Sequence, residues 1–287
     1  MITFFTTSKP FIGENRITQI NALRSWKQFS QDCEIIVFDK LIGDDLLINE
    51  LNIINILEIE KFSDKIPLPF VNDLFYKASR YAKNPICCYL NSDIILPESF
   101  LEIVLRIHNK LKSNYLLAGQ RYDIDIDTEL IFNRNWEIDF LSQNRHKMTL
   151  HPPTGTDYFV FPKNQFTYED IPPFIIGRPG WDNWFIYNGV TKKTKVVDIT
   201  NNTIVYHQNH IAAYGSDKSL DSASSNNLNL MPKNEIYGYF LDQSNYYIIN
   251  NKVKKRRIVN RFDYIKTLIN RWLKLITKQF RIISNKK

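Results

Sequence analysis

Glycine, cysteine and long apolar runs are scarce in this sequence, and each scarcity excludes a class of protein. Only 9 of the 287 residues are glycine, so a glycine-rich loop that cradles a dinucleotide is not expected. The three cysteines, Cys33, Cys87 and Cys88, are odd in number and two are adjacent in an apolar run. This pattern predicts reduced, buried thiols instead of a disulfide framework. No stretch reaches the ~18 apolar residues that a membrane span requires.

Residues 1–7 are apolar and have no basic leader, so no secretory signal is expected and the protein is predicted to be cytoplasmic. The charge is distributed unevenly. Residues 252–287 hold 8 Lys and 5 Arg against the single acid Asp263, whereas the whole chain has a net charge of +7. The body of the protein is therefore mildly acidic and its C-terminal tail is strongly basic.

The tail has the spacing of an amphipathic helix. Apolar residues recur every three to four positions, and basic residues fall largely elsewhere around the helix. The apolar positions are Ile258, Phe262, Ile265, Ile269, Trp272, Ile276, Phe280 and Ile283. A stripe with Trp and Phe, rimmed by Lys and Arg, suits an anionic membrane surface. Residues 252–287 are thus predicted to hold the protein at the inner face of a membrane, and nucleic-acid binding is not expected. The alternative is a helix docked on the domain with a solvated basic face.

Strand and helix patterns alternate over the first part of the chain. Strands are expected at 2–7, 34–38, 52–59 and 85–90, and helices at 15–29, 71–82 and 97–112. Such alternation predicts an α/β fold with a mostly parallel sheet flanked by helices. The later part predicts strands at 115–122 and 196–207, an aromatic strand before residue 161, a short helix reaching 184, and a flexible Ser/Asn-rich loop at 215–229.

Polar residues end three of the predicted strands, and ligands of parallel sheets bind beyond these ends. The residues are Thr6 and Thr7, Asp39, and the segment from Asn91 to Asp93. The carboxylate of Asp93 is a hard oxygen ligand that suits Mg²⁺ or Mn²⁺ shared with a diphosphate. The alternative role for Asp93 is to cap the following turn.

Two further segments carry candidate chemistry. Asp182 lies between Trp181 and Trp184; an apolar surround favours a carboxylate that acts as a general base, and aromatic faces suit sugar rings. The alternative is a helix-capping Asp182 with both tryptophans in the core. His207 and His210 lie three residues apart at a predicted strand end, and one of them joining Asp93 on a metal is the sharper interpretation. The alternative is a pair of ordinary surface or core histidines.

Less specific candidates complete the set. Asp157 follows a Gly-Thr turn on the aromatic strand and is a candidate for acceptor binding, although a satisfied, half-buried Asp is the alternative. Arg24, Arg80 and Arg121 are candidate cations for a diphosphate. Each of the three is also a candidate for an ordinary salt bridge.

Taken in order, these motifs resemble the GT-A glycosyltransferases, and more closely a bacterial and plant branch of nucleotide-diphospho-sugar transferases. The resemblance covers residues 1–215. It rests on a Lys-Pro-Phe turn at 9–11, a Gln-x-Asn-Ala-x-x-Ser-Trp helix at 19–26, Asn-x-Asp at 91–93, Gly-x-Arg at 119–121, Asp-Tyr-Phe-Val-Phe-Pro at 157–162, Pro-Pro-Phe-x-x-Gly-Arg at 172–178, Trp-Asp-Asn-Trp at 181–184 and His-Gln-Asn-His at 207–210. Two departures stand out: Asn91 replaces the more widespread Asp, and Ile211-Ala212 follow where the branch has Asp-Tyr.

The resemblance implies a fold, an activity and roles. It implies a GT-A domain over 1–250, divided into a nucleotide-binding half at 1–112, an acceptor and catalytic half at 113–215, and a loop and extension at 216–250, followed by the basic tail at 251–287. Thr6, Thr7, Asp39, Arg80, Asn91 and Asp93 would contact the nucleotide-sugar donor; Asp93 with His207 or His210 would bind Mn²⁺ or Mg²⁺; Asp182 would deprotonate the acceptor hydroxyl; Asp157, Trp181 and Trp184 would face the acceptor.

The expected activity is metal-dependent, inverting sugar transfer to a glycan or lipid-linked acceptor in surface polysaccharide synthesis. Two other classes stay open. A sugar-phosphate nucleotidyltransferase would share the sheet but needs a Gly-rich, Lys-bearing phosphate loop, which residues 6–13 do not supply. The second open class is a catalytically degenerate module that binds nucleotide sugars at a membrane.

Overall fold

A computed structural model describes residues 1–39, 45–210, 220–232 and 239–256. The chain divides into two compact units, Met1–Lys254 and Lys255–Lys287; nearly all described residues belong to the first. A nine-stranded mixed sheet runs through that unit in the order β13-β12-β10-β6-β9-β4-β1-β2-β3. Its strands are β1 (Ile2–Thr7), β2 (Glu34–Phe38), β3 (Ile54–Ile56), β4 (Ile86–Leu90), β6 (Tyr115–Ala118), β9 (Tyr158–Pro162), β10 (Lys195–Asp198), β12 (Tyr246–Ile249) and β13 (Lys252–Lys255).

From β12 to β3, the large sheet is parallel except around β9, which is antiparallel to both β4 and β6. Alternate side chains of its strands enter two separate apolar clusters, as the two-residue period of a strand requires. In β1, Phe4 packs in the first cluster and Phe5 in the second. The burial of both faces explains why these strands are continuous apolar runs.

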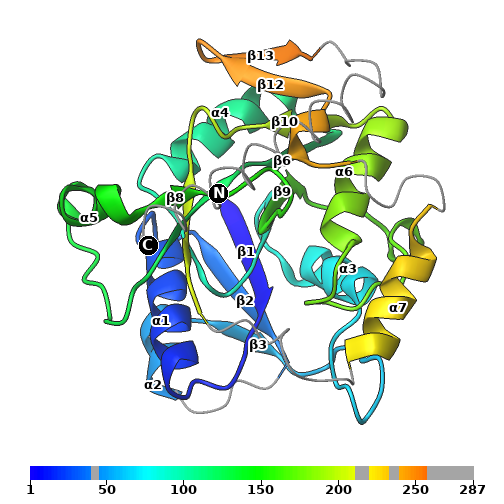
Figure 1. Ribbon diagram of the computed structural model, residues 1–287, viewed down its shortest axis with the longest axis horizontal. Coiled ribbons are helices and arrows are strands. Elements are labelled where there is room, and N and C mark those ends of the chain that lie inside the picture. Colours follow the sequence, from blue (N-terminus) through cyan, green and yellow to red (C-terminus); the bar gives the residue numbers. More distant parts are fainter. Residues whose placement is uncertain (40–44, 211–219, 233–238, 257–287) are drawn as a thin grey trace, which may run out of the picture. The chain divides into compact units, whose positions relative to one another are not determined.

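Helices cover the two faces of the large sheet (Figure 1). The first cluster includes side chains of α1 (Glu14–Lys27), α2 (Asp45–Leu51) and α4 (Phe100–Leu111). The second includes side chains of α3 (Val71–Tyr81), α6 (Trp181–Thr191) and α7 (Leu220–Leu230). The predicted α/β architecture, a mixed sheet flanked by helices, is therefore confirmed. Cys33, Cys87 and Cys88 are free and buried, as predicted.

A second, four-stranded sheet has the order β5-β11-β7-β8. It consists of β5 (Ile94–Ile95), β7 (Arg121–Ile124), β8 (Thr149–Leu150) and β11 (Val205–Gln208). Tyr206 and Ile124 of this sheet pack with Trp136 and Phe140 of α5 (Trp136–Asn144) in a third cluster. The small sheet has consequences for function, because it joins segments that follow three different strands of the large sheet.

Two predicted strands are each divided between the sheets. Residues 115–122 form β6 and β7, separated at Gly119 and Gln120, and residues 196–207 form β10 and β11, separated by a turn. Gly119 has a specific reason to be glycine, because a Cβ there would lie 2.3 Å from the hydroxyl oxygen of the buried Tyr158. The prediction of one continuous strand was wrong in both places.

The C-terminal predictions also need correction. Residues 220–229, predicted as part of a flexible loop, lie in α7, which ends at Leu230, and the rest of that loop, 215–219, lies outside the described residues. Residues 252–255, predicted to begin the helical tail, form β13. The amphipathic helix itself falls on 257–287, which lie outside the described residues. Among the described residues, no helix combines the length and apolar character needed to cross a bilayer.

Candidate metal and catalytic site

Asp93 lies in the turn that follows the buried strand β4. The backbone N–H of Ile94 donates to the carbonyl of Asn91 across this turn, at 3.2 Å, and the N–H of Asn91 donates to the carbonyl of Asp157, at 2.9 Å. These bonds fix the end of β4 to the start of β9 and set the direction of the turn. Asp93 is therefore held beyond the carboxyl end of a parallel strand, where ligands of such sheets bind.

The register of the small sheet brings His207 to the same place. β11 pairs antiparallel with β5, with His207 opposite Ile94, and parallel with β7, with His207 opposite Asp123. The backbone N–H of Gln208 also donates to the carbonyl of Asp93, at 3.2 Å. Two residues separated by more than a hundred positions thus become neighbours through strand pairing.

Asp93, His207 and His210 offer three ligand atoms that all lie within 4.8 Å of one another. The Nε2 atom of His210 is 2.9 Å from Oδ2 of Asp93, and the Nε2 atom of His207 is 3.8 Å from the same oxygen. All three side chains are largely buried, with 14 to 18% of each exposed. The other carboxylate oxygen, Oδ1 of Asp93, is buried and has no hydrogen-bond partner among the described residues.

This donor set fits a divalent cation. An unpaired, buried carboxylate oxygen is costly unless something binds it, and two imidazole nitrogens face the same carboxylate. Burial lowers the pKa of His207, so its ring is neutral near pH 7 and its nitrogen is able to bind metal. Burial would raise the pKa of Asp93, but its hydrogen bond with His210 and the nearby His207 and Lys9 lower it overall. The carboxylate is therefore ionised, as a metal ligand must be.

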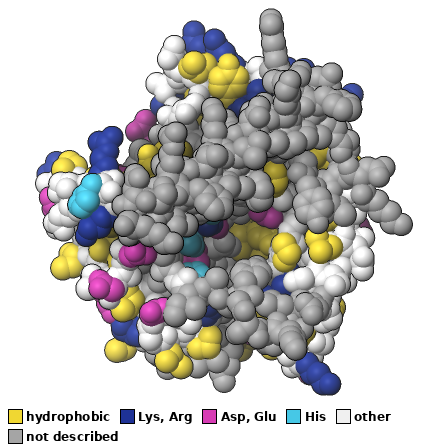
Figure 2. All heavy atoms as spheres, viewed as in Figure 1, with side chains coloured by type: hydrophobic (Ala, Val, Ile, Leu, Met, Phe, Trp, Pro, Cys, Tyr) yellow, Lys and Arg dark blue, Asp and Glu magenta, His cyan; other side chains and the backbone are white. Residues whose placement is uncertain are grey.

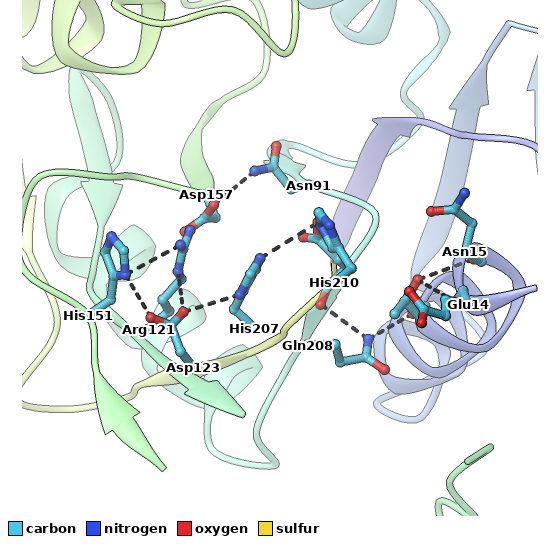
Figure 3. A network of polar contacts seen from close by, with 12 residues as sticks. Glu14, Asn15, Asn91, Arg121, Asp123, His151, Asp157, His207, Gln208 and His210 are labelled. Atoms are coloured by element: carbon cyan, nitrogen blue, oxygen red, sulfur yellow. Dashed lines mark hydrogen bonds and ion pairs between the residues drawn. The ribbon is translucent and has the colours of Figure 1, made fainter. Parts of the chain in front are cut away.

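A second layer of polar residues surrounds His207 (Figure 3). The carboxylate of Asp123 lies 3.1 Å from Nδ1 of His207, accepts a hydrogen bond from Nε of Arg121 at 2.9 Å, and lies 2.7 Å from Nδ1 of His151. Burial would raise the pKa of Asp123, but the hydrogen bond with His151 and the charge of Arg121 lower it overall. A charged carboxylate thus lies behind the imidazole of His207, on the side away from Asp93.

Arg121 connects this layer to the end of β4. It forms an ion pair with Asp157 as well as with Asp123. The other oxygen of Asp157 accepts a hydrogen bond from the side-chain amide of Asn91 at 2.9 Å, and the amide oxygen of Asn91 accepts one from the hydroxyl of Tyr89 at 2.7 Å. Because both oxygens of Asp157 have partners within the chain, the structure places this residue in the supporting network and not, as predicted, facing an acceptor.

Asp182 lies in the first turn of α6 (Trp181–Thr191), close enough to Asp157 for its charge to act on it. Gly180 precedes the helix with φ of 102°, a backbone conformation that favours glycine. The backbone N–H of Thr156 donates to Oδ2 of Asp182 at 3.2 Å. Burial raises the pKa of Asp182 to about 6, against the hydrogen bond from Thr156, which lowers it, and the negative charge of Asp157 raises it further. A carboxylate with a pKa near neutrality is suited to accept a proton.

The two tryptophans beside Asp182 have another role than the predicted one. Trp181 and Trp184 are 5% and 6% exposed and pack in the second apolar cluster. Trp181 contacts Tyr89 edge to face, with ring centroids 5.2 Å apart. The prediction that their faces bind a sugar acceptor is therefore not supported, because the surrounding core leaves almost no ring surface accessible.

The predicted nucleotide residues lie at the carboxyl ends of strands of the large sheet, with one exception. Thr7 is opposite Phe38 in the pairing of β1 with β2, so Thr6, Thr7 and Asp39 meet at the carboxyl ends of these strands. The carboxylate of Asp39 forms an ion pair with Lys61, with 2.7 Å between the charged atoms. Arg80 is exposed in the last turn of α3, which leads into the amino end of β4. Arg80 therefore lies near the amino ends of the strands, whereas Asp93 lies beyond their carboxyl ends.

Side chains of the motif at 19–26 on α1 form hydrogen bonds with the segments on which the site residues lie. The side-chain oxygen of Gln19 accepts a hydrogen bond from the backbone N–H of Lys9 at 2.7 Å, and its side-chain NH₂ donates one to the carbonyl of Lys9 at 3.0 Å. The indole N–H of Trp26 donates to the carbonyl of Ile94 at 2.8 Å. Asn21 donates to the side-chain oxygen of the buried Gln208 at 2.9 Å. These residues hold the loop after β1, the strand after Asp93 and the strand of His207 on a single helix.

A cleft of about 440 Å³ opens beside His210. Its lining combines residues of α1 with the chain after β7: Glu14, Ile17, Thr18, Asp125, Ile126, Asp127, Asn209 and His210. Figure 2 shows acidic and histidine side chains close together near the middle of the face seen. His210 of the Asp-His-His cluster is thus accessible from an open, acidic space.

Sequence reasoning missed Asp123, His151 and Gln208 as members of the site, and treated Arg121 only as a candidate diphosphate cation. The alternating acids after 122 were visible in the sequence, but nothing showed which of them faces a histidine. That information resides in the register of β7 and β11, which pairs Asp123 with His207.

No protein-family model matches the chain, and no curated protein matches it. Among solved structures, the chain is similar to TarS from S. aureus. A structure of TarS residues 1–349 aligns with 11% identity and a TM-score of 0.47, covering 72% of this chain and 60% of that one. The same fragment in complex with UDP-GlcNAc aligns with 14% identity and a TM-score of 0.48, covering 77% and 61%. The chain therefore spans about three fifths of these TarS chains.

Proposed function

We propose that this protein is a glycosyltransferase that moves a sugar from a nucleotide-sugar donor to a hydroxyl of a glycan or lipid-linked acceptor. The observation that carries the proposal is the convergence of Asp93, His207 and His210 at the carboxyl edge of the sheet, with one carboxylate oxygen left unpaired. Thr6, Thr7 and Asp39 lie at the ends of the neighbouring strands and would line the base and ribose of the donor.

Asp93, His207 and His210 would hold Mn²⁺ or Mg²⁺. Such a cation, when bound, offsets the negative charge of a diphosphate leaving group. Nitrogen ligands favour Mn²⁺ over Mg²⁺, because Mg²⁺ strongly prefers oxygen. The ε-ammonium of Lys9, whose charge already acts on Asp93, follows the end of β1 and would add to the positive charge near the phosphates.

Asp182 would act as the general base. In the proposed reaction its carboxylate takes the proton from the acceptor hydroxyl, and the hydroxyl oxygen forms a bond to the anomeric carbon. The bond from that carbon to the diphosphate breaks at the same time, and the electron pair leaves with the diphosphate. Attack opposite the leaving group inverts the configuration. Burial of Asp182 favours this role because it moves the pKa of the carboxyl towards the working pH.

The experiment that tests the proposal measures thermal unfolding with UDP-, GDP-, CMP- and dTDP-sugars, each with Mn²⁺ and with EDTA. A ligand at 100 times its Kd stabilises the folded state by about 2.7 kcal/mol. We expect one nucleotide class to raise the Tm with Mn²⁺ and to lose most of that effect in EDTA, and turnover of that donor with release of its nucleotide to follow. A shift that is independent of metal and without turnover would instead identify a degenerate binding module.

We further propose, from the sequence, that residues 252–287 bind an anionic membrane surface and place the enzyme near acceptors for surface polysaccharide synthesis. Replacing Arg261, Arg271, Lys274, Lys278 and Arg281 by Gln in the full chain removes five charges, each worth on the order of 1 kcal/mol at such a surface. Sedimentation with anionic vesicles should then show a loss of more than about a hundredfold in affinity. Equal binding of both proteins would contradict the membrane role, as would equal binding of the unaltered chain to neutral vesicles.

A further inference from the structure

Asp123 is placed between a metal-facing histidine and two other polar side chains. Its Oδ1 atom accepts a hydrogen bond from Nε of Arg121 at 2.9 Å and lies 3.1 Å from Nδ1 of His207. Its Oδ2 atom lies 2.7 Å from Nδ1 of His151. Each oxygen of the carboxylate therefore lies close to an imidazole nitrogen. The contact with His207 is a short polar contact and not an aligned hydrogen bond, because the buried Nδ1 of His207 has no hydrogen-bond partner among the described residues. Figure 3 shows Asp123 directed at the ring of His207 from the side away from His210.

The chemistry of these groups determines which nitrogen of His207 carries the proton. The guanidinium of Arg121 only donates hydrogen bonds, and an ionised carboxylate only accepts them. The negative charge of Asp123 lies 3.1 Å from Nδ1 of His207, where it attracts a proton and repels a lone pair. A neutral imidazole in this place is therefore more stable with its proton on Nδ1. The lone pair then belongs to Nε2, the atom that faces Oδ2 of Asp93.

We propose that Asp123 is a positioning residue of the metal site. It fixes the tautomer and orientation of His207 so that Nε2 is the ligand atom, and Arg121 holds Asp123 in place. Carboxylates beside the second ring nitrogen of metal-binding histidines commonly have this effect. The inference rests on the metal site of the proposed function, but it concerns metal binding and does not require sugar transfer.

The same network extends beyond the metal ligands. Arg121 also binds Asp157, which holds Asn91 at the end of β4, two positions before Asp93. The segments of His207 and of Asp93 are thus connected twice, once by strand pairing and once by side chains. Asp123, Asp157 and Arg121 are largely buried behind the candidate ligands, where their ion pairs and hydrogen bonds connect the segment of His207 with the segment of Asp93.

The test is a titration of the full chain with Mn²⁺ alone. Asp123→Ala removes the carboxylate behind His207 and should weaken Mn²⁺ binding by about 10- to 100-fold. Asp123→Asn keeps the shape and one accepting oxygen, so it should recover part of the affinity. Asp139→Ala, which removes an exposed acid from α5, is the matched control and should leave the affinity within about twofold, as for other surface sites.

A second measurement separates positioning from a general loss of structure. With His207 already changed to Gln, Asp123→Ala should weaken Mn²⁺ binding by less than about twofold, because interacting residues are not additive. The visible absorption bands of bound Co²⁺ should also shift in Asp123→Ala. The inference is overturned if Asp123→Ala lowers the Tm of the metal-free protein but binds Mn²⁺ like the control, or if the unaltered chain binds no Mn²⁺.

These outcomes separate the two proposals. An unaltered chain that binds Mn²⁺ through His207 and Asp123 but transfers no sugar would refute the glycosyltransferase function and support the positioning role. A chain that transfers sugar, but whose Asp123→Ala variant keeps its full affinity for Mn²⁺, would support the function and refute the positioning role.

Discussion

Asp93→Asn is expected to reduce metal-dependent sugar transfer by about a thousandfold or more, the equivalent of roughly 4 kcal/mol in transition-state stabilisation. Asp93 is the only carboxylate of the three-residue cluster, and both histidine Nε2 atoms face its Oδ2. The amide of Asn keeps the shape but loses the negative charge, so it binds a divalent cation much more weakly. The measurement is kcat/KM with the donor identified by thermal shift, over a range of Mn²⁺ concentrations.

The control for this substitution is Asp139→Asn, which removes a charge from the exposed surface of α5 and should leave kcat/KM nearly unchanged. EDTA should stop the unaltered enzyme and added Mn²⁺ should restore it, whereas Mn²⁺ should restore little activity in Asp93→Asn. If Asp93→Asn retained full activity with an unchanged requirement for Mn²⁺, the assignment of Asp93 as a metal ligand would be wrong.

Much of the fold could be predicted because the strands of the first half are buried on both faces. Each of these strands is a short apolar run between helices with an apolar face, and β1 and β2 occur at the predicted residues. The division of 115–122 into β6 and β7 could not be predicted, because its cause is distant in sequence. Gly119 passes beside the hydroxyl of Tyr158, and only the folded chain brings them together.

The helix α7 was missed for a comparable reason. Ser and Asn have low helix propensity, so a run of them between apolar segments predicts a loop. In the structure the buried Asn227 accepts a hydrogen bond from the N–H of Ile175 at 2.7 Å and donates to its carbonyl at 3.0 Å. These tertiary bonds satisfy the backbone of the loop before α6, and they outweigh the weak local preference.

The candidate site shows the same division. Asp93 could be named from its place after a buried strand, and His207 or His210 as its partner, but not that both histidines lie beside the same carboxylate. The contribution of Asp123 could not, because it depends on the pairing of β7 with β11. Trp181 and Trp184 show the reverse error: their residue type suggests sugar binding, but aromatic residues more often fill cores, and here they do.

Asp182→Asn is expected to reduce kcat by about 100- to 10,000-fold, the usual contribution of a general base, while making the folded protein more stable. Because burial raises the pKa of Asp182 from 3.8 to about 6, the ionised carboxylate destabilises the folded state at neutral pH. The destabilisation is absent below about pH 4 and complete above about pH 6, so the stability gained from Asn should appear as the pH rises through this range. Its size at pH 7 should be about 1 to 3 kcal/mol.

The pH dependence of activity in the unaltered protein should reflect the ionisation of Asp182. A general base acts only when deprotonated, so kcat/KM should fall about tenfold per pH unit below roughly pH 6 and level off above it. Asp182→Asn should lack this dependence, whereas Asp139→Asn should keep both the dependence and the original stability. Full activity in Asp182→Asn, or a profile that stays flat from about pH 5 to 7 in the unaltered enzyme, would assign the base to another residue. Loss of activity with a gain in stability is the combination that a purely structural role for Asp182 does not produce, because removal of a structural carboxylate lowers both.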